Sequence, residues 1–173
     1  MSLARAEARI RDVPDFPKPG IVFKDIAPML QDGASLRAVN RGLSEAIATL
    51  KPDMVAGVES RGFLFAPPVA DALGVGMVMI RKPGKLPFKT VRMEYALEYG
   101  TDVIEMHVDA VTPGQRVVIV DDVLATGGTA AAAGALVASQ GAVVVGYAFA
   151  VELAFLGGRE RLGDTPVVAL FKY

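Results

Sequence analysis

Short continuous runs of apolar residues recur along this chain and alternate with segments in which apolar residues follow a helical spacing. The continuous runs are bounded by turn-forming or polar residues and predict strands at residues 53–58, 75–80, 116–122, 142–151 and 167–171. Runs of this kind are typical of strands that are buried on both faces of a parallel sheet. The alternating run at 103–108 predicts a further, half-exposed strand.

The segments between these strands predict helices. Spacing and composition favour helices at residues 2–12, 35–50, 62–74 and 129–140. Ser35 is suited to cap the second helix, and Pro67 and Pro68 predict a late start or a kink in the third. The order strand–helix–strand occurs twice, which predicts an α/β fold with a mostly parallel sheet and helices on both faces.

In two segments the apolar residues follow neither a helical nor a strand spacing. Residues 15–26, "DFPKPGIVFKDI", are punctuated by proline and glycine and predict an irregular loop. Residues 81–102 carry many charges and predict a second, longer loop, and long loops in compact domains are usually functional or mobile. With no repeat and no composition break, the chain reads as a single domain over residues 1–173.

Composition narrows the classes of function. The chain has 173 residues, a formal net charge of -1, no cysteine and one histidine. The charge excludes a general basic footprint for nucleic acid, and the residue counts exclude disulfides, thiol chemistry and a histidine-cluster metal site. The N-terminus has no signal-peptide pattern, so we expect a soluble, cytoplasmic protein.

One uncharged window, from residue 124 to 151, is long enough in principle to cross a bilayer. Gly127-Gly128 and the segment 139–141 break it into a helix-like half and a β-like half. We interpret it as buried core and expect no membrane association.

The segment "VVIVDDVLATGGT", residues 117–129, carries the most specific chemistry. In "ATGGT" two glycines allow positive φ, two threonines offer hydroxyl donors, and the following helix points its N-terminus at the same place. These features suit a phosphate, although a tight strand-to-helix turn with a cap would look similar. The spacing matches neither a Walker loop nor a dinucleotide fingerprint.

Asp121 and Asp122 precede this turn. Carboxylates beside a phosphate site suit a ligand that also carries vicinal hydroxyls, because charge-assisted hydrogen bonds are strong. A ribose 5-phosphate has both groups. The acids could also hold Mg²⁺ indirectly or face a sugar carbon that becomes cationic, and the plain alternative is a solvated strand end.

This segment closely resembles the 5-phosphoribosyl 1-diphosphate (PRPP) binding motif of type I phosphoribosyltransferases. The resemblance implies that Asp121 and Asp122 bind the ribose hydroxyls and act in catalysis. It implies that the 5-phosphate is bound by Ala125, Thr126, Gly127, Gly128 and Thr129. It also implies that family's fold, with a small N-terminal base-binding hood at about residues 1–33 and a flexible catalytic loop at about residues 82–102.

Further segments, "DFPKPGIVFKDI", "VAGVESRGFLFAPPVA", "VMIRKPGKLP" and "EYALEYGTDVIEMHVDAV", resemble the adenine phosphoribosyltransferase family over nearly the whole chain. For the pyrophosphate, the resemblance implies contacts from Glu59, Ser60, Arg61, Arg81, Lys82 and Lys85. It also implies a cis peptide bond between Glu59 and Ser60. The plain alternatives are a turn capped by arginine and a solvated basic loop.

For the base, the resemblance implies that adenine stacks on Phe23 and is read by the backbone of Val22 and Lys24, with Val123 nearby. The family commonly has arginine in place of Lys24 and often leucine in place of Val123. Glu98, with Tyr99 beside it, belongs by resemblance to the closing loop and would act as acid or base near the purine N7. Without the resemblance, Phe23 reads as a core aromatic and Glu98 as a solvated side chain.

The implied activity is transfer of the phosphoribosyl group from PRPP to adenine, giving AMP and pyrophosphate, by a homodimer. The implied cofactor is Mg²⁺, held mainly by PRPP and water with no direct protein ligand. Three alternatives stay open: a sister enzyme for another purine or a pyrimidine, a non-enzymatic PRPP-sensing regulator, and a structural α/β domain. A panel of bases tested for pyrophosphate release distinguishes the first of these.

Overall fold

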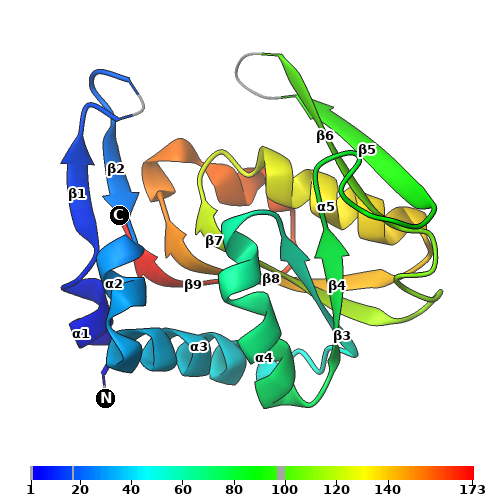
Figure 1. Ribbon diagram of the computed structural model, residues 1–173, viewed down its shortest axis with the longest axis horizontal. Coiled ribbons are helices and arrows are strands. Elements are labelled where there is room, and N and C mark those ends of the chain that lie inside the picture. Colours follow the sequence, from blue (N-terminus) through cyan, green and yellow to red (C-terminus); the bar gives the residue numbers. More distant parts are fainter. Residues whose placement is uncertain (1, 17, 97–99) are drawn as a thin grey trace. The chain divides into compact units, whose positions relative to one another are not determined.

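The computed structural model describes residues 2–16, 18–96 and 100–173, which Figure 1 traces along the sequence. The chain divides into two compact units, Met1–Gly42 and Leu43–Tyr173. Each unit has its own secondary structure, and the boundary between them falls within the long helix α3 (Gly33–Ala48). The roles predicted for about residues 1–33, as a base-binding hood, and for about residues 82–102, as a catalytic loop, stay predictions.

The first unit contains a short β-hairpin that the sequence did not predict. Helix α1 (Leu3–Glu7) is followed by antiparallel strands β1 (Arg11–Pro14) and β2 (Val22–Asp25). The helix predicted for 2–12 and the irregular loop predicted for 15–26 are therefore both shorter than predicted. Opposite charges face each other in register across the strands. Lys24 Nζ lies 2.6 Å from Asp12 Oδ1, and this cross-strand pair stabilises a hairpin that has little apolar alternation.

Helix α3 is capped by Asp32, which follows the short helix α2 (Ala27–Gln31). Asp32 Oδ2 accepts hydrogen bonds from the Ser35 backbone N–H at 3.0 Å and from the Ser35 hydroxyl at 2.6 Å. The prediction that Ser35 caps this helix was therefore wrong, because Ser35 is the residue whose N–H donates to the capping side chain.

The second unit is built on the predicted parallel sheet. Its five strands pair in the order β4-β3-β7-β8-β9, and every neighbouring pair is parallel. Their bounds are β3 Met54–Val58, β4 Gly76–Ile80, β7 Arg116–Leu124, β8 Val143–Glu152 and β9 Val167–Lys172. The continuous apolar runs therefore predicted the sheet correctly.

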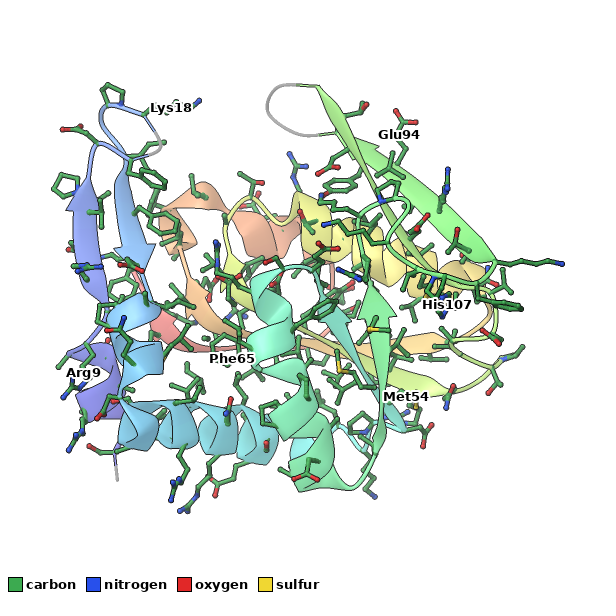
Figure 2. All side chains as sticks on the ribbon, in the orientation of Figure 1. Arg9, Lys18, Met54, Phe65, Glu94 and His107 are labelled. Carbon is green, nitrogen blue, oxygen red and sulfur yellow. The ribbon has the colours of Figure 1, made fainter. Side chains whose placement is uncertain are left out.

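Two helices connect these strands. Helix α4 (Ala66–Leu73) follows a 3-10 turn at Arg61–Leu64 and has Pro67 and Pro68 in its first turn, which confirms the predicted late start. Helix α5 (Gly128–Ser139) links β7 to β8. Because the two crossovers move in opposite directions along the sheet and are right-handed, α4 and α5 cover opposite faces. Phe65, at the start of α4, and Ile119, on β7, are fully buried. Phe65 is labelled in Figure 2.

A second hairpin occupies part of the predicted loop at 81–102. Strands β5 (Thr90–Ala96) and β6 (Thr101–His107) pair antiparallel and are visible in Figure 1 as a separate ribbon. Val91, Met93 and Tyr95 pack against the core, whereas the residues between them are exposed. The loop prediction was wrong here because the charged residues are the exposed half of a strand alternation and were interpreted as part of a loop.

The uncharged window at 124–151 forms the end of β7, helix α5 and most of β8. Among the residues that the structure describes, no helix combines the length and the apolarity required to cross a bilayer. Beyond β8 lie two 3-10 turns that were not predicted, Ala154–Leu156 and Gly158–Leu162.

Candidate active site

The candidate site lies at the point in the sheet where the order in which the chain adds strands reverses. Strands β3 and β7 are neighbours, but the chain leaves β3 towards one sheet edge and leaves β7 towards the other. Such a switch point opens a crevice at the carboxyl ends of the two strands. The segment "ESRG" follows β3, and "DDVLATGG" begins in the last part of β7, so the fold brings together two motifs that lie about sixty residues apart.

Strand β7 is longer than predicted, and the two acids lie within it. Its pairing with β3 ends at Val120 opposite Gly57, whereas its pairing with β8 continues to Leu124 opposite Glu152. Asp121 and Asp122 therefore occupy the part of β7 that extends past β3. Because successive side chains of a strand point to opposite faces, the two carboxylates differ in environment.

Asp122 is buried and forms an ion pair with Arg61. Its side chain is only 7% exposed, and Arg61 Nε donates a hydrogen bond to Asp122 Oδ2. Arg61 itself is half exposed. The carboxylate of Asp122 thus fixes the arginine of the "ESRG" turn beside the end of β7.

Asp121 is held in a crowded position between its neighbour on the strand and the turn after β3. The Asp122 N–H donates to Asp121 Oδ1 at 2.8 Å, and a Cβ added to Gly62 would lie 2.9 Å from the same oxygen. Burial, and then the neighbouring charge of Asp122, raise the pKa of the Asp121 carboxyl well above its usual range. Hydroxyl donors or a further positive charge would stabilise its ionised form.

Residues 125–129, here termed the phosphate loop after their predicted role, rest directly on another stretch of backbone. Gly127 has a φ of +80°, and a Cβ there would collide with the carbonyl oxygen of Gly158. A Cβ on Gly158 would in turn collide with the carbonyl oxygen of Ala125. Glycine is thus required on both sides of this contact, which fixes the loop at the N-terminus of α5.

Gly158 was missed by sequence reasoning, as was the ion pair beside it. Glu152, buried at the end of β8, accepts hydrogen bonds from Arg159 Nε at 2.5 Å and Nη2 at 2.7 Å. Arg159 Nη1 also donates to the Val167 carbonyl at 2.9 Å. The hydrogen bonds from Arg159 lower the pKa of Glu152, so this pair anchors the turn that supports the phosphate loop. The only local signal was the glycine pair at 157–158.

Residues 81–85, here termed the basic loop, gather around Glu59. Its carboxylate accepts hydrogen bonds from Arg81 Nε at 3.1 Å, from the Lys82 N–H at 3.0 Å and from Lys85 Nζ. Burial opposes ionisation of Glu59, but these donors together hold its pKa below the usual value. The predicted cis peptide bond between Glu59 and Ser60 is present, and Ser60 is exposed beside it.

A second carboxylate holds the basic loop from the hairpin side. Glu105 on β6 is 1% exposed and accepts hydrogen bonds from the Gly84 N–H at 3.0 Å and from Arg92 Nε at 3.0 Å. The backbones of Glu105 and Arg81 also form a β-bridge. The basic loop is therefore ordered by carboxylates from two sides.

The residues predicted to contact a base lie in both units. Val22, Phe23 and Lys24 form β2 of the first unit, where the Phe23 ring lies edge-on to Phe16 with centroids 5.2 Å apart. Val123 is half-buried on β7 of the second unit. Glu98 and Tyr99 lie outside the described residues, so their predicted roles stay predictions.

Comparison with known proteins agrees with this geometry. A family model described as "Phosphoribosyl transferase domain" matches residues 28–165. The chain is 57% identical over 166 residues to the adenine phosphoribosyltransferase of Anaeromyxobacter dehalogenans (strain 2CP-1 / ATCC BAA-258), covering 96% of each protein.

Solved structures show the same similarity. The adenine phosphoribosyltransferase of Thermoanaerobacter pseudethanolicus superposes with a TM-score of 0.95 at 51% identity, covering 99% of both chains. The Giardia lamblia enzyme complexed with 9-deazaadenine superposes with a TM-score of 0.92 at 37% identity, covering 100% of this chain and 98% of that one. The chain therefore belongs to the adenine phosphoribosyltransferase family.

Proposed function

We propose that this protein transfers the 5-phosphoribosyl group of PRPP to adenine and releases AMP and pyrophosphate, as in purine salvage. One observation carries the proposal: two carboxylates and a glycine-rich loop at a helix N-terminus lie on one stretch of chain at the switch point of the sheet. A ribose with a 5-phosphate has a hydroxyl face and an anionic end that match this arrangement.

In this proposal each half of the crevice binds one part of PRPP. The phosphate loop binds the 5-phosphate, and Asp121 and Asp122 face the ribose. The pyrophosphate lies near Glu59, Ser60 and Arg61, within reach of the basic loop residues Arg81, Lys82 and Lys85. The support is that Asp122 and Arg61 are already joined, which brings the ribose-binding and pyrophosphate-binding segments side by side.

The reaction breaks the bond between ribose C1 and a pyrophosphate oxygen, and the electron pair leaves with the pyrophosphate. Positive charge develops on the sugar ring, and adenine N9 forms the new bond to C1 from the opposite face. The carboxylate of Asp121 would be stabilised by that charge and would in turn stabilise it. The chain contributes mainly by positioning and by electrostatics.

Adenine is proposed to lie against Phe23, with the backbone of Val22 and Lys24 reading its edge and Val123 beside it. Glu98 would accept the proton that adenine loses near N7 as N9 bonds to C1, with Tyr99 next to it on the closing loop. The support is the family resemblance of these segments, together with the binding of 9-deazaadenine by the similar Giardia lamblia enzyme.

Mg²⁺ is proposed as the cofactor, bound mainly through PRPP oxygens and water. Among the described residues no group of three histidine, cysteine, aspartate or glutamate side chains is arranged to hold a metal ion. Asp122 is paired with Arg61, which also argues against direct coordination there. Bound to PRPP, the ion would offset negative charge on the leaving pyrophosphate. We also propose a cytoplasmic homodimer, on the family resemblance alone.

The proposal is tested by measuring pyrophosphate release from PRPP with adenine, guanine, hypoxanthine, xanthine and uracil in parallel. We expect release with adenine well above the other bases. Release with a different base would make the protein a sister transferase. Affinity for nucleic acid without turnover would favour a PRPP-sensing regulator instead.

A matched variant tests the site itself. Replacing Asp121 and Asp122 together by alanine should abolish turnover or raise the KM for PRPP strongly. Glu94, a carboxylate on the exposed face of β5, serves as the control when replaced by glutamine (Figure 2). Intact activity of the double variant would contradict the role given to the two acids.

A further inference from the structure

The β5–β6 hairpin places a polar cluster between the two regions that are proposed to bind anions. Tyr95 and Asp102 are register partners on the two strands, so their side chains lie on the same face. On one side Lys82 Nζ, from the basic loop, donates to Asp102 Oδ2. On the other side Thr129 Oγ1, from the phosphate loop, lies 3.2 Å from the Tyr95 hydroxyl.

The Tyr95 hydroxyl can satisfy all of its contacts at once. A phenol has one donor and two acceptor positions. Its oxygen lies 3.2 Å from Asp102 Oδ2, to which it donates, and it can accept from Lys82 Nζ at 3.2 Å and from the Thr129 hydroxyl. One hydroxyl therefore touches a residue of the basic loop and a residue of the phosphate loop.

Asp102 is itself held in a fixed orientation. Its second carboxylate oxygen accepts a hydrogen bond from the Val103 N–H at 2.8 Å. The hydrogen bond from Lys82 lowers the pKa of Asp102, and although burial opposes it, the contact with Asp102 raises the pKa of Lys82. Both side chains therefore stay ionised at neutral pH, and the ammonium group of Lys82 has a fixed place.

Lys82 keeps capacity for a ligand in this arrangement. An ammonium group has three donors, and the contacts to Asp102 and Tyr95 use two of them. Its side chain is 35% exposed, so a diphosphate oxygen can approach the third. A lysine held by two partners loses less conformational entropy on binding an anion than a free one would.

We propose that Asp102 and Tyr95 are positioning residues, Asp102 for Lys82 at the pyrophosphate and Tyr95 for both Lys82 and Thr129. This inference rests on the proposed function for the identity of the two anions. It gives the hairpin a role of its own: the Tyr95–Asp102 pair, next to the turn between β5 and β6, sets the geometry of both phosphate-binding regions.

The test measures binding of inorganic pyrophosphate and of ribose 5-phosphate separately, by calorimetry on the full chain at constant Mg²⁺. Neither probe contains a base, so the result does not depend on the choice of substrate base. Asp102→Asn should weaken pyrophosphate binding by about tenfold and leave ribose 5-phosphate within about twofold, since a charged contact is lost at one subsite only. Tyr95→Phe should weaken both probes by about threefold to fivefold.

Two controls separate positioning from a general effect on the hairpin. Glu94→Gln removes a carboxylate from the same hairpin and should change neither affinity. Asp102→Glu restores the carboxylate and should recover part of the pyrophosphate affinity. A thermal unfolding curve for each variant identifies any that fails to fold. If Tyr95→Phe fails to fold, Asp102→Asn alone provides the test.

The outcomes are distinct. Equal losses of both probes in Asp102→Asn, or unchanged or tighter pyrophosphate binding, would overturn the positioning role while leaving the proposed function in place. If the unmodified protein binds neither probe, the anion subsites are absent and both proposals fall. In steady-state assays the KM for PRPP should rise in Asp102→Asn while the KM for adenine stays the same.

Discussion

The phosphate loop and the basic loop both suit anions, but they differ in charge and in the interactions that hold them in place. The phosphate loop has no charged residue and is fixed by backbone packing, with Gly127 and Gly158 in direct contact. The basic loop has three cationic side chains, and the described contacts pair Arg81 and Lys85 with Glu59 and Lys82 with Asp102. One region is neutral and held by backbone packing, whereas the other consists of cationic side chains that carboxylates hold in place.

This difference matches the different fates of the two anions in the proposed reaction. The 5-phosphate stays attached to the ribose from PRPP to AMP, so a fixed site can hold it throughout. The pyrophosphate must be bound, separated from C1 and released. Cations that stay paired with carboxylates remain ordered and charge-compensated when pyrophosphate leaves, which limits the cost of its release.

The largest expected effect concerns Asp121, at the strand end between the two regions. Asp121→Asn should lower turnover by about 100-fold or more, the scale found when a group that stabilises transition-state charge is removed. The same change should raise thermal stability at neutral pH. A carboxyl whose pKa is raised in the folded state binds its proton more tightly there, so it destabilises the fold increasingly as pH rises above its ordinary range.

Melting temperatures of the two proteins between about pH 5 and pH 8 check this sign. The advantage of the asparagine variant should grow with pH up to the raised pKa of Asp121 and then level off. A variant that is both inactive and less stable at every pH would contradict the environment described for this carboxyl.

The next largest effect should come from the backbone contact under the phosphate loop. Gly158→Ala places a Cβ against the Ala125 carbonyl, and overpacking of this kind should weaken ribose 5-phosphate binding by about tenfold to 100-fold. Pyrophosphate binding should change little. Gly33→Ala, with open space around its Cβ, is the matched control. Similar losses for both probes would mean that the two regions are not independent.

A smaller effect is expected at the basic loop. Glu59→Gln removes the charge that holds Arg81 and Lys85, and pyrophosphate binding should weaken by about threefold to tenfold while ribose 5-phosphate binding is retained. Calorimetry with the two probes measures both. Tighter pyrophosphate binding in this variant would show instead that Glu59 competes with the anion for the same cations.

The smallest expected effect separates the regions by salt. Raising the ionic strength from about 0.05 to 0.5 M should weaken pyrophosphate binding about threefold more than ribose 5-phosphate binding, because partly exposed cations are screened. A sodium chloride series at constant Mg²⁺ measures the two slopes. Equal slopes would contradict the contrast between a neutral and a cationic site.

Much of the fold could be predicted because its signals are local. The strands β3, β7 and β8 are buried on both faces, and this leaves continuous apolar runs in the sequence. The two acids and the phosphate loop are adjacent in the chain, so their joint chemistry is visible without a structure. The parallel sheet with helices on both faces could then be inferred from two strand–helix–strand units.

What escaped prediction depends on partners that are distant in sequence. The contact between Gly127 and Gly158 joins backbone segments about thirty residues apart, and Asp102 accepts a hydrogen bond from Lys82 of the basic loop, about twenty residues before it. Strand β5 was missed although Val91, Met93 and Tyr95 alternate with exposed residues, because the charged outer face obscured the pattern. No local periodicity encodes the contact between Gly127 and Gly158 or the one between Lys82 and Asp102.

The uneven pairing of β7 has a consequence for how the protein opens. Val117–Val120 are hydrogen-bonded into strands on both sides, whereas the register beyond Val120 continues on the β8 side. Backbone amides in the first half should exchange with solvent only on global unfolding, and those in the second half by smaller local fluctuations. The border between the slowest and the faster-exchanging amides therefore falls between Val120 and Asp121, so that the acids move with a more labile segment while remaining anchored to the least labile one.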